Sequence, residues 1–390
     1  MTKKLLTFLA LSLMAVFISA CFQTHKYHPE TKSELQELVE TPKINLGEID
    51  TSKITDMSEL FKESKRKDFS GIEKWDVSSV RNMEGMFRNA EYFNQNINKW
   101  DVSSVRNMSR MFVGAESFNQ PLNKWDVGNV SNMSYIFAGA KSFNQPLDRW
   151  DVSSVRNMEG MFRGAESFNQ PLDKWDVSSV KNMEAMFGHA KYFNQNINKW
   201  DVSSVRNMSR MFVRAESFNQ PLDRWDVSSV TNMRAMFYGA ESFNQPLDSW
   251  DTSLVTNMSY MFAGAKSFNQ PLNKWDVSSV TNMWRMFGEV IFMITYGAKP
   301  LTYGAESFNQ PLDKWDVSKV TDMAFMFAGA KSFNQSLNNW NVGKVTDMTE
   351  MFAGAKSFNQ PLDSWNVSKV KEMKDMFRDS PAKRPKWYRE

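Results

Sequence analysis

The sequence predicts one elongated α/β solenoid, in which every 25-residue unit contributes one short helix and one short strand. A tryptophan recurs at this spacing from Trp75 to Trp275 and, after one interruption, from Trp315 to Trp365. Around each tryptophan lies the pattern W-D-V-S-S-V-x-N-M-x-x-M-F-x-x-A-x-x-F-N-Q-x-L, and a degenerate first copy has Ile49 in the tryptophan position. A fixed period of this length is typical of a solenoid, so we place a single repeat domain of 13 units at residues 43–377.

The first half of each unit has the spacing of one face of a helix. Val105, Met108, Met111 and Phe112 are separated by 3, 3 and 1 residues, which predicts a helix of about two turns. The position before the first methionine is Asn or Asp in all units but the last, and such side chains favour a helix start by accepting hydrogen bonds from its first N–H groups. Gly114 is placed where a left-handed residue typically ends a helix.

The second half of each unit is predicted to be an extended strand. In the segment from Phe118 to Trp125, Pro121 excludes a helix and favours an extended backbone for the residue before it. When units stack, Phe118, Leu122 and Trp125 are expected to meet their counterparts in the next unit and to form continuous apolar columns. Because no unit can bury its own apolar face, each unit depends on its neighbours.

The aspartate after each tryptophan, as in Asp101, forms a column of carboxylates when the units stack. An aspartate in such a position typically stabilises a turn by accepting hydrogen bonds from the backbone two residues on. A calcium-binding ladder is an alternative, and paired carboxylates can also serve a hydrolase. Repetition of the same Asp-Val-Ser-Ser in most units favours the role in turns.

Both ends of the stack and one insertion depart from the repeat. Residues 31–42 are predicted to form a capping helix, because Thr31 and Glu34 match a capping box and an apolar face follows. Residues 378–390 form either a frayed C-terminal cap or a basic, aromatic tail that binds a partner. Fifteen extra residues lie near 288–302, and this insertion is either a decayed repeat or a loop that grips a ligand.

The first residues have the layout of an export signal. Two lysines precede an apolar stretch, residues 5–17, which is too short to span a bilayer comfortably. The following Ile-Ser-Ala-Cys21 resembles the lipobox of bacterial lipoproteins, in which the cysteine becomes the lipid-bearing N-terminus. We expect a signal peptide at 1–20, lipid on Cys21 and a tether at 21–30; a plain cleaved signal and an uncleaved anchor are the alternatives. Lipidation implies a cell-envelope location, at the outer membrane or cell surface, with lipid as the only membrane contact.

The sequence lacks the signatures of common enzymes. The chain has 3 histidines and 1 cysteine, so neither a Cys-His or Ser-His-Asp site nor an internal disulfide is predicted. The pair His25-x-x-His28 has no further zinc ligands nearby, and no phosphate loop or dinucleotide fingerprint occurs. We therefore expect no enzyme activity, no metal and no cofactor.

Charge argues against nucleic acid as a partner. Without the two lysines of the signal, 45 of the 47 basic residues remain, against 44 acidic residues, whereas strong nucleic-acid binders carry a clear basic patch. One local asymmetry is a basic residue before the tryptophan in the first half of the stack. These residues form either a solvated, charge-balanced face or a candidate binding face for acidic glycans or proteins: Lys99, Lys124, Arg149, Lys174, Lys199 and Arg224.

The pattern W-D-V-S-x-V-x-[ND]-M-x-x-M-F resembles the BspA-like leucine-rich-repeat family of bacterial surface lipoproteins, and related repeats occur in mycoplasma surface lipoproteins. The resemblance covers about Lys43 to Phe377. It implies a leucine-rich-repeat-like solenoid with strands on one curved face and helical segments on the other, and it carries over no catalytic residue. It also implies adhesion, so we expect a surface lipoprotein that binds a protein or glycan of a host or neighbouring cell. A structural envelope protein without a host ligand is the alternative.

Overall fold

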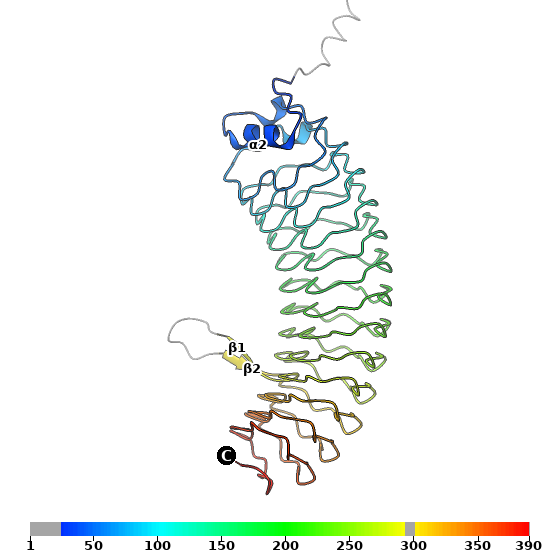
Figure 1. Ribbon diagram of the computed structural model, residues 1–390, viewed down its shortest axis with the longest axis vertical. Coiled ribbons are helices and arrows are strands. Elements are labelled where there is room, and N and C mark those ends of the chain that lie inside the picture. The colour runs from blue at the N-terminus through cyan, green and yellow to red at the C-terminus, as the bar shows by residue number, and fades with distance from the viewer. Residues whose placement is uncertain (1–24, 293–300, 390) are drawn as a thin grey trace, which may run out of the picture.

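The computed structural model describes residues 25–292 and 301–389, which form one curved stack of units (Figure 1). The export signal and Cys21 lie outside the described residues. Within the described part, no helix is both long enough and apolar enough to cross a membrane. Regular elements are few: helix α2 (Lys32–Glu40), the 3-10 helices η1 (Leu46–Glu48) and η2 (Ile72–Lys74), and strands β1 (Val290–Phe292) and β2 (Leu301–Tyr303). The units themselves are therefore built from turns.

Helix α2 covers the first unit of the stack (Figure 1). The Thr31 side chain accepts a hydrogen bond from the N–H of Glu34 at 3.2 Å, which starts the helix as an N-cap. Leu35 and Val39 are buried against the first unit, and the Gln36 side chain donates to the Leu60 carbonyl at 3.2 Å. Helix α2 thus covers apolar side chains at the end of the stack and donates a hydrogen bond to it.

The first half of each unit differs from the expected helix. It forms what we call the inner rung, residues 107–114 and their equivalents. The N–H groups of Met108, Arg110, Phe112 and Gly114 donate to carbonyls of the following unit at 2.8–3.4 Å, instead of to carbonyls four residues back in their own unit. Parallel bridges link the Asn or Asp that opens each rung to its counterpart in the next, from Asp56 to Glu372.

Backbone conformation explains why no helix forms in the rung. Arg110 has a φ of 59° and Gly114 a φ of 65°, and each unit has left-handed residues at these two positions or at one of them. An L-amino acid in the left-handed backbone conformation interrupts a right-handed helix. The remaining donors close tight turns, as in Met111 N–H to the Met108 carbonyl at 3.2 Å. Turns of this length bury the same residues that a helix would. The prediction from the spacing is therefore confirmed for burial and is wrong for the secondary structure.

The predicted N-cap and the predicted strand both take other forms. The Asn107 side chain does accept an early N–H of the rung, that of Ser109 at 3.0 Å, but it closes an Asx turn. In the described residues, apart from one bridge between Tyr27 and Ile49 in the degenerate first copy, no bridge involves segment 118–125 or its equivalents. There the Asn119 N–H donates to the side-chain oxygen of Asn94 in the preceding unit at 3.0 Å, so a ladder of side chains replaces the strand ladder.

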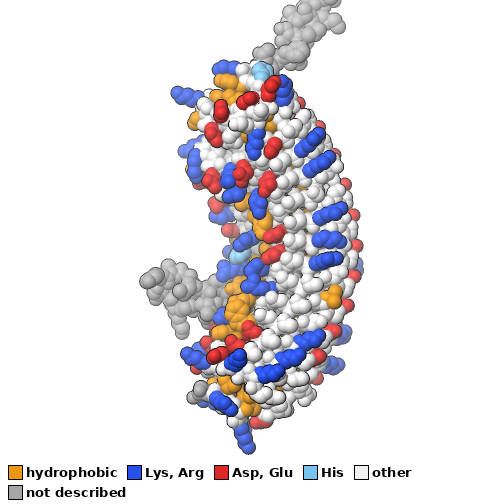
Figure 2. Space-filling model, viewed as in Figure 1, with side chains coloured by type: hydrophobic (Ala, Val, Ile, Leu, Met, Phe, Trp, Pro, Cys, Tyr) orange, Lys and Arg blue, Asp and Glu red, His pale blue; other side chains and the backbone are white. Residues whose placement is uncertain are grey.

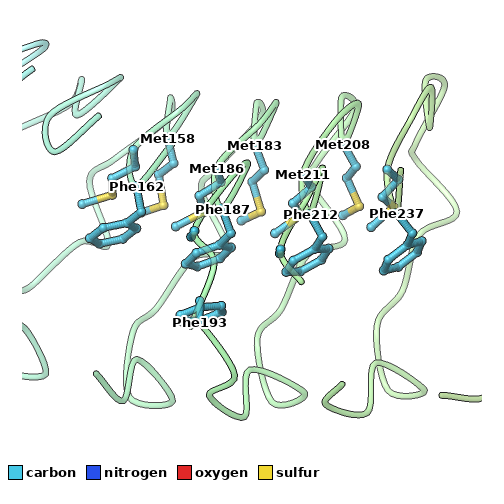
Figure 3. Packing of buried hydrophobic residues seen from close by; sticks show 14 of the residues in the cluster. Met158, Phe162, Met183, Met186, Phe187, Phe193, Met208, Met211, Phe212 and Phe237 are labelled. Carbon is cyan, nitrogen blue, oxygen red and sulfur yellow. The ribbon is translucent and has the colours of Figure 1, made fainter. Parts of the chain in front are cut away.

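The apolar columns are confirmed. Trp125, Phe118 and Leu122 are each at most 3% exposed, and Figure 3 shows the phenylalanine column from Phe162 to Phe237 beside its methionines. Each tryptophan of the column also donates its ring N–H to a carbonyl of the preceding unit, as Trp125 does to Ile97 at 3.1 Å. A buried indole therefore keeps its polar group satisfied.

Curvature follows from unequal spacing across the unit. Equivalent ring centroids in successive units lie 5.6 Å apart at Phe112, 5.9 Å at Phe118 and 6.3 Å at Trp125. Backbones joined by ladder hydrogen bonds are only about 4.8 Å apart. Each unit is thus a wedge with its narrow edge at the inner rung, and the stack bends with the rungs on the concave side (Figure 1).

The insertion leaves the stack unbroken. Strands β1 and β2 pair antiparallel, with Val290 opposite Tyr303, and project as a hairpin from the concave side (Figure 1). Beyond it the rings of Phe287 and Phe308 lie 4.1 Å apart, the same distance as between Phe262 and Phe268 in the preceding unit. The extra residues are therefore accommodated outside the repeat contacts.

The predicted turn role of the aspartate column is confirmed. The Asp101 carboxylate accepts from the Ser103 N–H at 3.1 Å and from its hydroxyl at 2.6 Å, across the turn closed by Val105 N–H and the Val102 carbonyl. The serine hydrogen bonds lower the pKa of Asp101, and the same cause lowers the pKa of Asp151 and Asp176. No group of three or more His, Cys, Asp or Glu side chains in the described segments could hold a metal ion.

Truncation of one tryptophan tests the columns. Trp225 is 3% exposed, and its ring stacks on Trp250 with centroids 6.4 Å apart. We expect Trp225→Ala to cost about 3–5 kcal/mol of stability, by loss of burial and creation of a cavity. Hydrogen exchange should accelerate first in the units on either side. Trp225→Phe is the matched control, because it keeps one aromatic ring in the column and loses the hydrogen bond to Ile197 and part of the buried ring area. Unchanged exchange in Trp225→Ala would contradict a structural role for the column.

Acid should destabilise the stack through its turn aspartates. A carboxyl whose pKa is lower in the folded state stabilises the fold above its unfolded pKa, about 3.9, and loses that contribution as pH falls through the folded pKa. Asn341 shows that an amide keeps this turn, since it accepts from the Gly343 N–H at 3.2 Å. Replacing Asp151, Asp176 and Asp226 together by Asn should reduce the loss of urea resistance between pH 7 and pH 3. An identical pH dependence in variant and parent would assign acid sensitivity to other carboxylates.

Candidate functional site

The inner rung presents one side-chain row whose members differ from unit to unit. In the pattern M-x-x-M-F-x-x, the four x positions hold charged, aromatic or small residues in different units, while the positions around them repeat. We call the side chains at these positions the inner face. It follows the concave side of the stack, where Figure 2 shows hydrophobic side chains among charges of both signs.

At the second x position most units carry a side chain, although the left-handed backbone there is the conformation that glycine adopts with the least strain. Its thirteen members are left-handed, and only Gly85 and Gly160 lack a side chain. Each of the others pays about 1–2 kcal/mol for that conformation. At Gly160 an added Cβ would lie 2.3 Å from Cε1 of Tyr135, so this glycine makes room for the neighbouring aromatic ring.

The middle of the inner face is a polar pocket. The Tyr135 hydroxyl donates to Glu159, and burial together with this hydrogen bond raises the pKa of Tyr135 to about 12. One unit further, Glu184 accepts from Arg210 at 2.9 Å. Tyr135, Glu184, Arg210 and His189 help to line a pocket of about 410 Å³. The carboxylates of Glu159 and Glu184 are thus engaged by neighbouring side chains, which holds these side chains in place.

His189 is half-buried in this pocket. Burial lowers its pKa, and the charges of Arg214 and Arg163 lower it further. The imidazole is therefore neutral at physiological pH. A neutral imidazole can donate from one ring nitrogen and accept at the other, so it adds a polar contact without adding charge.

An aromatic and arginine cluster follows toward the hairpin. Tyr260 contacts Tyr238 and Trp284 edge to face, with centroid distances of 5.8 and 4.7 Å. Arg234 lies over the Tyr260 ring at 5.8 Å, and Arg285 lies 4.2 Å from the Phe325 centroid. Tyr238, Tyr260, Arg234 and neighbouring side chains line a second hollow of about 220 Å³. Such rings and guanidinium groups are enriched at the energetic centres of binding surfaces.

Arg285 and Tyr260 are also polar groups partly removed from water. Burial raises the pKa of the Tyr260 hydroxyl. The Arg285 Nε is buried and, within the described residues, has no hydrogen-bond partner, although one terminal nitrogen donates to the Glu289 carbonyl at 3.3 Å. The guanidinium thus keeps unused donor capacity while its flat faces lie against aromatic rings.

The predicted basic column lies elsewhere on the surface. All six side chains are exposed, and Lys174 forms an ion pair with Asp148 at 3.3 Å. They lie in segment 118–125 and its equivalents, directly before the tryptophans. They are not among the residues that line the inner-face pockets. His28 contacts Asp50 at 3.2 Å near the capped end of the stack.

The inner face was not identified from the sequence. A helix would place these x positions on its solvent-facing side, where charged residues need no special explanation. A usable signal was present: tyrosine, tryptophan and arginine replace small residues at these positions in the units from Tyr135 to Phe325. Their convergence became visible only when the stacking placed successive units side by side.

Comparisons with known proteins place the chain among mycoplasma repeat proteins. A family model described as "Mycoplasma protein of unknown function, DUF285" matches residues 32–150, 142–230, 217–293 and 298–387. No curated protein matches the chain. Among solved structures, "Crystal structure of TLR13-ssRNA13 complex" is similar with a TM-score of 0.21 and 11% sequence identity, over 84% of this chain and 51% of that chain. The chain thus spans about half the length of that protein.

Proposed function

Because the chain belongs to the DUF285 family of mycoplasma proteins of unknown function, we propose its role from its own surface. It is a lipid-anchored cell-surface protein that binds a macromolecule of a host or neighbouring cell along its inner face. The resemblance of its repeats to BspA-like leucine-rich repeats, whose members are associated with adhesion, supports this proposal.

The aromatic and arginine cluster is the observation that carries the proposal. Tyr260, Trp284 and Arg285 come from adjacent units, and Tyr260 and Arg285 are held in left-handed conformations that glycine would adopt without strain. Backbone strain that persists at a surface row is a reason to infer function there.

A long ligand suits this surface better than a small one. The pockets at Tyr135 and at Tyr260 adjoin on the same concave side and share Arg210 and Val213, so together they extend along several units. Contacts repeated on a rigid array add through effective concentration. The ligand we propose is an extended protein segment or glycan with acidic groups for the arginines and flat or apolar groups for the rings. The proposed role is recognition without catalysis.

The anchor completes the proposed arrangement. Cys21 with lipid would hold the stack at the membrane by its capped end, because α2 follows the tether directly in the sequence. Stable anchoring takes more than one acyl chain, as lipoprotein processing supplies. The inner face would then stand away from the membrane along the length of the stack.

Substitution on two faces tests the binding proposal. The full chain is screened for binding to immobilised extracellular-matrix proteins and sulfated glycans, and the best binder is measured again with variants. We expect Arg234→Ala with Tyr260→Ala to weaken binding at least tenfold. Lys199→Ala with Arg224→Ala, on the basic column, should leave binding unchanged. Hydrogen exchange checks that all variants are folded. The reverse pattern would assign binding to the basic column, and no binder would favour the structural envelope role.

The anchor has its own test. Cells are fed a fatty-acid analogue, and the protein is recovered from membrane and soluble fractions. We expect label and membrane retention in the parent, and loss of both in Cys21→Ala. Cys21→Ser serves as a second variant of nearly the same size. Label retained by either variant would overturn lipidation at Cys21. Proteolysis of intact cells should shorten the parent protein if the stack faces outward.

A further inference from the structure

The stack has a direction that makes its two ends chemically different. In every rung the aligned N–H groups point to the following unit, and the aligned carbonyls accept from the preceding one. The first rung therefore presents carbonyls at its outer edge, and the last rung presents N–H groups. Unpaired backbone groups at an edge are a template for pairing with another chain.

The carbonyl edge is covered by helix α2. Gln36 of α2 donates to one of its carbonyls, that of Leu60, and the Lys32 ammonium donates to the Ser58 hydroxyl at 2.5 Å. Arg66 then ties α2 and the segment after it to the stack, through hydrogen bonds to the Val39 and Thr41 carbonyls at 3.1 and 2.9 Å. The helix therefore lies where a further rung would have to pair.

The N–H edge is open. The last rung runs from Glu372 to Asp379, and its carbonyls accept from the preceding unit, as Lys374 does from Glu350 at 2.9 Å. In the described part of the chain, no backbone carbonyl accepts from the N–H groups of this rung that point outward, those of Met373, Asp375, Phe377 and Asp379. We call these four donors the open edge.

The C-terminal segment covers only one side of the last unit. Trp387 extends the tryptophan column, stacks on Trp365 at 6.2 Å and donates to the Leu362 carbonyl at 2.9 Å. Tyr388 packs edge to face on Phe377. Beside the open edge, however, Val370 and Met373 remain partly exposed, although their equivalents in every inner unit are buried.

A basic groove lies between the last rung and this segment. It has a volume of about 460 Å³ and is lined by Val370, Met373 and Trp387 together with four cations: Lys371, Lys374, Lys386 and Arg389. Glu372 is the single acidic residue in its lining. Residues 363–389 carry eight Lys or Arg against four Asp or Glu. The groove thus combines aligned N–H donors, an apolar floor and positive charge.

We propose that the open edge binds an extended acidic peptide, which adds to the stack as a further rung. The peptide's carbonyls accept from the four donors, its apolar side chains cover Val370 and Met373, and its carboxylates meet Lys371 and Lys374. Main-chain pairing supplies affinity in this mode, and side-chain pockets supply selectivity. Two copies of the chain cannot pair through this edge, because both would present donors, and the carbonyl edge of a second copy is covered by α2. The proposal does not depend on the inner face.

A peptide copied from the chain's own preceding rung is a defined probe. The sequence of residues 346–354, TDMTEMFAG, contains the acidic residues that correspond to Asp347 and Glu350, and this segment already makes the required contacts in the stack. The full chain is titrated with this peptide, with a scrambled peptide, with a version whose two acidic residues are lysine, and with inorganic phosphate. Amide hydrogen exchange is followed at the open edge.

We expect the copied peptide to slow exchange of the Met373, Asp375, Phe377 and Asp379 amides, and the lysine version to bind at least tenfold more weakly. Lys374→Glu should weaken binding of the copied peptide about tenfold. Lys319→Glu, an exposed residue of an inner unit, is the control and should not.

Three results would overturn the proposal: no protection at these amides, equal protection by phosphate alone, which would indicate an anion site, or protection that grows with protein concentration without peptide, which would indicate a second copy.

Discussion

The axial hydrogen bonds between inner rungs are the constraint on which the rest of the structure depends. Alternate peptide N–H groups of each rung are satisfied only by the following unit, while the groups between them close turns within the unit. Buried peptide groups without partners are costly, so a single unit cannot be stable by itself. The spacing that these bonds impose brings equivalent side chains into contact, and the columns of Phe, Met and Trp follow from it. Stabilising contacts between units therefore run along the axis of the stack, from each unit to its two neighbours. The fold needs no contacts between units that are far apart in the stack.

The same constraint sets the shape of the inner face. The rung spacing is fixed by hydrogen bonds, while the tryptophan spacing is fixed by the thickness and tilt of stacked rings, 6.3 Å at Trp125. The difference bends the stack toward the rung. Side chains on the concave side are consequently drawn closer together than those on the outside, which brings Tyr260 into contact with rings of both adjacent units. The curvature of the stack and the ring contacts in the aromatic cluster therefore have the same cause.

The buried residues were largely predictable from the sequence, whereas the backbone conformation of the units was not. Period and residue type identified the units and the buried columns because burial depends on spacing alone. The rung at Arg110 could not be distinguished from a helix, since an arginine gives no sign of a left-handed backbone. The segment at Asn119 was predicted to be a strand because Pro121 excludes a helix, yet its backbone N–H donates to the Asn94 side chain instead of to a neighbouring backbone. The arginines and rings of the inner face were visible as residues, but their convergence required the rung geometry.

The undisturbed stacking around the β1–β2 hairpin has a consequence for how such a molecule changes over generations. Residues Asn94–Val113 recur unchanged as Asn194–Val213, four units further along. Because each unit contacts only the units next to it, a copied block needs no compensating change elsewhere, and neither does a loop that emerges between two rungs. Recombination within the gene can therefore lengthen or shorten the protein by whole units, and can move the aromatic and arginine cluster along the stack, while the contacts between neighbouring units stay the same.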